Sequence, residues 1–84
     1  MRSIDFQQLR VNLALIELDL VGTFLRVARQ SSNAQARQRN RVYARQAYLM
    51  ARHYATALPP KMNRGIGDRL VEAKNELEDA GELV

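Results

Sequence analysis

Apolar residues recur at steps of three and four along the first third of the chain, which is the spacing of an α-helix. The first stripe contains Phe6, Leu9, Leu13, Ile16, Leu20, Phe24 and Val27. The second stripe, on the opposite side of the same helix, contains Ile4, Val11, Leu15, Leu18 and Leu25. Because a helix that packs against one neighbour needs only one stripe, the pattern predicts a central helix over about residues 4–30, with neighbours on two sides. Ser3 or Asp5 is expected to cap its start.

A second helix is expected over about residues 33–58, after the polar turn formed by Ser31, Ser32 and Asn33. Its apolar stripe contains Tyr43, Ala47, Met50, Tyr54 and Ala57. We expect Tyr43 and Tyr54 to pack inward, and Tyr48 to lie at the edge of the stripe. The sequence Pro59-Pro60 is expected to end the helix, because proline lacks an amide donor and clashes with the preceding turn.

A third, shorter helix is expected over about residues 67–80, after a loop that contains Gly65 and Gly67. Its apolar stripe contains Ile66, Leu70, Ala73, Leu77 and Ala80. Short connections favour antiparallel neighbours. The chain is therefore expected to form one all-α domain over residues 1–84, an antiparallel three-helix bundle in which a long hairpin carries a shorter third helix.

The composition limits the environments and the chemistry in which the chain is expected to act. A domain of 84 residues buries a small core, so association would stabilise it. The chain has no cysteine and no apolar run long enough to span a bilayer, and we expect it to be cytoplasmic and free of membrane contact. Its one histidine, His53, has Leu49, Met50, Arg52 and Ala57 as helical neighbours and no carboxylate to orient it, so we expect no enzyme, metal, cofactor or small-molecule substrate.

The charges are distributed unevenly along the chain. Residues 20–67 contain nine basic side chains and no acidic one, whereas residues 68–84 contain six acidic side chains and two basic ones. Two interpretations are open. The basic segment binds an external anion such as nucleic acid, or the acidic segment packs beside it and neutralises it.

Two functional hypotheses follow from these patterns. The leading hypothesis is a protein–protein interaction module that self-associates, with a dimer favoured. Its candidate contact residues are Val11, Leu15, Leu18 and Leu25, because a short third helix would leave part of that stripe uncovered. The alternative is non-specific nucleic-acid binding through the basic side of the second helix, at Arg37, Arg41, Arg45 and Arg52. In that case Tyr48 is the candidate for stacking on bases.

Overall fold

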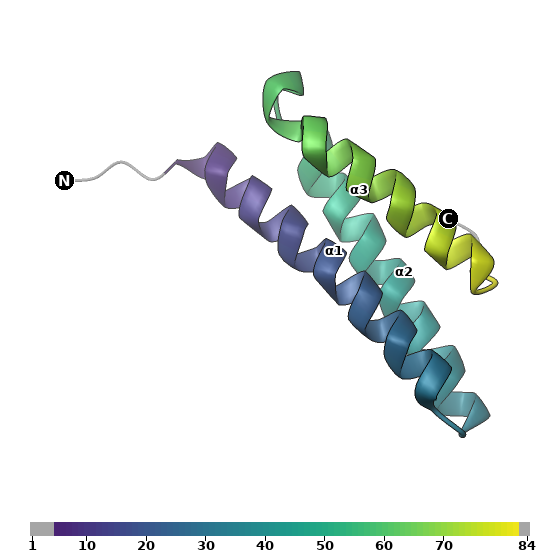
Figure 1. Cartoon of the computed structure of the whole chain (residues 1–84). Coiled ribbons are helices and arrows are strands. Elements are labelled where there is room, and N and C mark those ends of the chain that lie inside the picture. The colour runs from purple at the N-terminus through teal and green to yellow at the C-terminus, as the bar shows by residue number, and fades with distance from the viewer. Residues whose placement is uncertain (1–4, 83–84) are drawn as a thin grey trace.

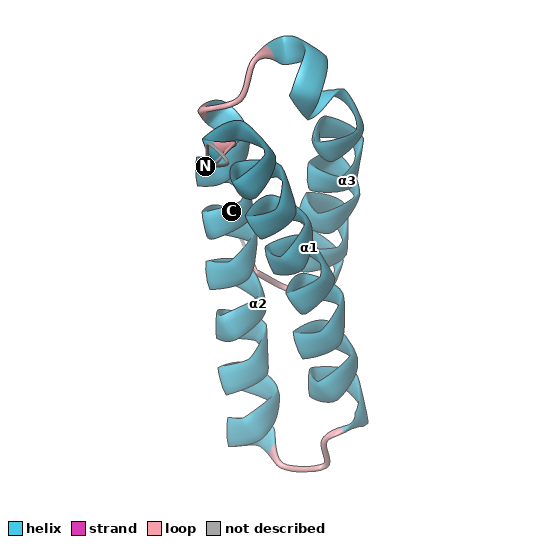
Figure 2. Cartoon of the chain, turned by 90° about the vertical axis from the view of Figure 1, so that its left-hand side faces the viewer, coloured by secondary structure: helices cyan, strands magenta, loops and turns pink. Residues whose placement is uncertain are grey.

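Three helices account for the fold. The computed structural model describes residues 5–82 and contains α1 (Phe6–Gln30), α2 (Ala34–Thr56) and α3 (Pro60–Asp79). Helices α1 and α2 form a long antiparallel hairpin, and α3 packs back along it (Figures 1 and 2). The predicted all-α three-helix bundle is confirmed. Within residues 5–82, no helix combines the length and the apolar character needed to cross a lipid bilayer.

Side-chain caps fix where the two hairpin helices begin. The Asp5 carboxylate accepts hydrogen bonds from the backbone N–H groups of Gln7 and Gln8, both at 3.1 Å. The Asn33 side-chain oxygen accepts from the backbone N–H groups of Gln35 at 2.8 Å and Ala36 at 3.2 Å. These caps satisfy amides that have no partner inside the helix. Asp5 is therefore the cap of α1, and the other candidate, Ser3, lies outside the described residues.

The third helix begins at Pro60, not near residue 67 as predicted. Proline suits the first position of a helix, because its φ angle is already helical and the amide it lacks would have no partner there. Gly65 and Gly67 lie inside α3, where no atom beyond the adjacent backbone of that helix comes within 4 Å of the position that a Cβ would occupy. The predicted loop over residues 61–67 is therefore wrong, and α3 gains about two turns at its start.

The core is built around alanines on the facing sides of α1 and α2. Ala14, Ala44 and Ala51 have no exposed surface. Tyr48 is 4% exposed and Tyr43 is 41% exposed, which reverses the prediction for these two tyrosines. The reason is that Tyr48 lies one turn from both Ala44 and Ala51, and so shares their side of the helix.

We expect Ala44→Leu to lower the free energy of unfolding by about 1–3 kcal/mol, because the added atoms have no room between the two backbones. Urea unfolding followed by circular dichroism measures the change. Ala34→Leu, at an exposed position in the first turn of the same helix, is the matched control and should be close to neutral. Equal stability of the two variants would show that the α1–α2 contact is looser than described.

Candidate functional site: the open face of the helical hairpin

Helix α3 covers one side of the hairpin and contacts both of its helices there. On α1, the Asp19 carboxylate accepts a hydrogen bond from the Arg69 guanidinium at 2.7 Å. On α2, Arg41 Nε lies 3.7 Å from Glu82 Oε1, just beyond the end of α3. Both views of the fold show α3 along the hairpin without a second layer on the other side (Figures 1 and 2). One side of the α1–α2 pair is therefore open among the described residues.

Large apolar side chains gather on that open side. The Phe24 and Tyr43 rings meet across the hairpin with their centroids 5.5 Å apart. The first apolar stripe of α1 continues from Phe24 in both directions, and Met50 lies two turns from Tyr43 on α2. We call this surface the open face, and its most exposed members are Phe6, Leu9, Ile16, Val27, Tyr43 and Met50. Leu13, Leu20 and Phe24 lie half-buried among them.

The stripe that was predicted to be free is instead part of the core. Leu18 is 5% exposed and Leu25 is 3% exposed, and Val11 and Leu15 pack half-buried against the same cluster. The prediction that these four residues form a free surface is therefore wrong. It took the wrong stripe of α1 as free. Ala73 lies near Leu18 and Ala80 lies near Leu25, and both alanines belong to the part of α3 that was predicted, so the added turns at Pro60 are not the cause. Ile4, the remaining member of that stripe, lies outside the described residues.

The four candidate anion-binding arginines all have partners within the chain. The Arg37 guanidinium donates to the Ser31 carbonyl oxygen at 3.0 Å, and Arg41 pairs with Glu82. Arg52 lies over the Tyr48 ring, 5.7 Å from its centroid, and Arg45 also has an interaction of its own. Tyr48 is buried, so it offers no ring face on which a base could stack. Nucleic-acid binding stays a prediction, but this arrangement does not favour it.

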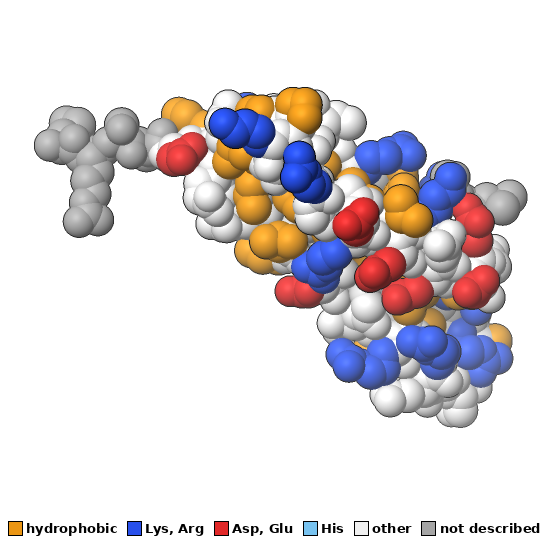
Figure 3. Space-filling model, turned by 45° about the horizontal axis from the view of Figure 1, so that its top comes forward, with side chains coloured by type: hydrophobic (Ala, Val, Ile, Leu, Met, Phe, Trp, Pro, Cys, Tyr) orange, Lys and Arg blue, Asp and Glu red, His pale blue; other side chains and the backbone are white. Residues whose placement is uncertain are grey.

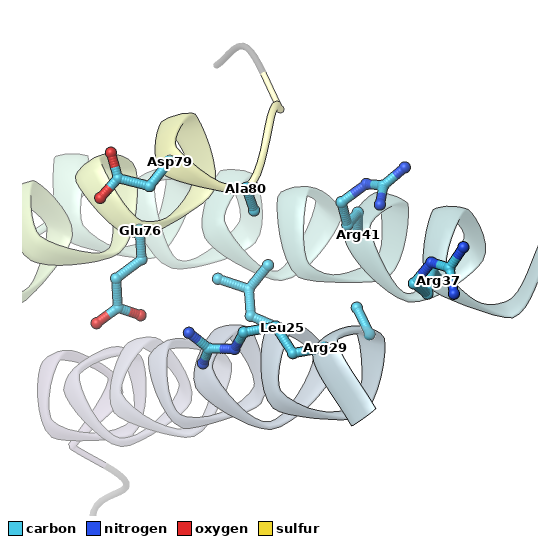
Figure 4. Close-up of a pocket in the computed structure, with 8 residues that line it drawn as sticks. Leu25, Arg29, Arg37, Arg41, Glu76, Asp79 and Ala80 are labelled. Carbon is cyan, nitrogen blue, oxygen red and sulfur yellow. The ribbon is translucent and has the colours of Figure 1, made fainter. Parts of the chain in front are cut away.

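Opposite charges face one another where α3 ends beside the hairpin. A pocket of about 280 Å³ has Arg29, Arg37 and Arg41 on its hairpin walls and Glu76 and Asp79 on its α3 wall. Figure 4 shows Glu76 extending from α3 toward the side of α1 that carries Arg29. Figure 3 shows the same relation over a wider area, with acidic side chains in a row and basic side chains gathered below them. The acidic segment therefore neutralises part of the basic segment within one chain.

Comparisons with known proteins add no further constraint on the site. The chain matches no protein-family profile, and no curated protein or solved structure matches it. Geometry and charge alone must therefore support any assignment of function.

We expect the Asp19–Arg69 pair to stabilise the packing of α3 only modestly, since both side chains are well exposed to solvent. Arg69→Ala should lower the free energy of unfolding by about 0.2–1 kcal/mol, and the loss should shrink as salt is added. Combining it with Asp19→Ala in a double-mutant cycle isolates the pair. Arg64→Ala, which removes another exposed arginine from α3, is the control. A coupling energy of zero would show that the pair contributes nothing to stability.

Proposed function

We propose that the protein is a helical protein–protein interaction module that self-associates through its open face. One observation carries the proposal: six large apolar side chains are exposed in the single chain, and helical spacing together with the Phe24–Tyr43 contact places them on one side of the hairpin. Isolated apolar residues are normal on protein surfaces, but contiguous apolar patches mark interaction sites. Val42 and Val71 are also exposed, and Val71 lies on α3, away from this surface.

The dimensions of the open face suit a small interface. The stripe from Phe6 to Val27 runs for roughly 32 Å at 1.5 Å per residue. Two helices with axes 8–10 Å apart present a surface roughly 17 Å wide, which gives a projected area of roughly 550 Å² per subunit. Stable complexes bury about 800 Å² on each partner, so this surface is at the small end of the range, and we expect a weak dimer whose population depends on concentration.

A second copy of the chain is the occupant that best fits this surface. Two hairpins that meet by their open faces would form a four-helix arrangement, with each α3 on the outside. In a two-fold dimer the same patch is buried on both subunits, so one apolar surface is sufficient. The added burial would also enlarge a core that a chain of 84 residues keeps small.

Non-specific nucleic-acid binding through Arg37, Arg41, Arg45 and Arg52 is the weaker proposal. Each of these side chains already has an intramolecular partner, and binding phosphate would require those contacts to be exchanged. The open face requires no such exchange, because its side chains face solvent.

We expect sedimentation velocity to show a monomer–dimer equilibrium for the unchanged chain across the micromolar range. Ile16→Glu should shift the chain to monomer, because it places a carboxylate in the middle of the open face. Val71→Glu is the matched control, since Val71 is 61% exposed and Ile16 is 54% exposed, and it should leave the equilibrium unchanged. The proposal fails if the unchanged chain is monomeric throughout, or if both variants weaken association equally.

A further inference from the structure

Two charged residues of opposite sign interrupt the apolar stripe of the open face. Phe6, Arg10, Leu13, Glu17 and Leu20 follow one another at alternating steps of four and three residues. Arg10 and Glu17 are seven residues apart, so they are rotated by about 20° from one another and separated by about 10 Å along the helix. They therefore lie on one side of α1, above and below Leu13.

Neither charge has a partner within the described part of the chain. No hydrogen bond or ion pair of Arg10 or Glu17 occurs among residues 5–82. Glu17 is half-buried between Leu13 and Leu20 and so has lost part of its hydration. The two side chains are too far apart along α1 to pair with each other. An association that buries the open face must supply partners for them, because an unpaired buried charge is strongly unfavourable.

We propose that the two copies pack antiparallel about a two-fold axis near Leu13, with Arg10 of each subunit paired to Glu17 of the other. This inference rests on the proposed self-association and adds its orientation. A two-fold axis perpendicular to α1 exchanges the positions above and below Leu13, so the two opposite charges meet twice. The two copies of α1 then overlap from about Phe6 to about Val21, so this dimer buries the part of the open face nearest the start of α1. A parallel arrangement would place Arg10 against the second Arg10 and Glu17 against the second Glu17, which is unfavourable for both pairs.

The positive charge at the hairpin tip, the end at which the α1–α2 turn lies, also favours the antiparallel orientation. Arg26, Arg29, Arg37 and Arg39 lie near the α1–α2 turn, and Glu76 and Asp79 of α3 offset only part of their charge. A parallel dimer would bring two such tips together. An antiparallel dimer separates them, because residue 32 lies about 28 Å from Leu13 along the hairpin, and the two tips then stand about 55–60 Å apart.

A charge exchange tests the pairing. Glu17→Arg and Arg10→Glu should each raise the dissociation constant of the dimer by about tenfold, because each places like charges together at two symmetric points. The double variant Arg10→Glu/Glu17→Arg should restore the constant to within about threefold of the unchanged chain, since the pairs reform with exchanged signs. Asp68→Arg makes the same change of charge on α3, outside the open face, and should have no effect. A double variant as weak as the single ones would overturn the pairing.

A distance measurement tests the orientation independently of any charge. The chain contains no cysteine, so Ser32→Cys gives one site per subunit for a nitroxide label. Double electron–electron resonance should give a distance of about 55–60 Å between the two labels in the antiparallel dimer, and of less than about 20 Å in a parallel dimer. A dimer with a short separation overturns the orientation and leaves self-association standing. A chain that stays monomeric at every concentration overturns both.

Discussion

The close approach of α1 and α2 is the constraint on which the rest of the structure depends. Ala14, Ala44 and Ala51 are fully buried where the two helices meet, so little side-chain volume separates the backbones. A contact lined by alanine leaves little room for large rings or long aliphatic chains between the two backbones. Most of the large side chains therefore lie to either side of the line along which α1 and α2 meet. On one side they find α3, and on the other they gather around Phe24 and Tyr43 as the open face.

The third helix then decides which apolar side of the hairpin is core and which is surface. Leu77 of α3 is fully buried and Ile66 nearly so, which closes the cluster formed by Leu18, Val21 and Leu25. Charged contacts lie around the rim of that packing, at Asp19–Arg69 and at Arg41–Glu82. Exposed ion pairs contribute little stability. Apolar burial therefore stabilises the packing of α3, and the two ion pairs favour the side of the hairpin on which α3 packs.

Much of this fold could be predicted from the periodicity of the sequence, and the exceptions have physical causes. The bounds of α1 and α2 follow from apolar spacing and from the caps at Asp5 and Asn33. The start of α3 was missed because Pro60 and the two glycines suggest a loop, whereas proline is well suited to a first helical turn. The free surface was missed because both stripes of α1 have helical spacing. Only the side of α1 on which α2 and α3 pack determines which one is covered, and spacing within one helix does not encode that side.

The positions of the tyrosines have a consequence for how the molecule can be observed. The chain has no tryptophan, so its three tyrosines dominate absorption and emission in the near ultraviolet. Tyr48 lies in the core beneath Arg52, whereas Tyr43 lies on the open face beside Phe24. The environment of Tyr48 therefore changes on unfolding, whereas that of Tyr43 changes both on unfolding and when the open face is covered. A change in tyrosine emission that depends on protein concentration, with the helix content constant, would thus report on the open face.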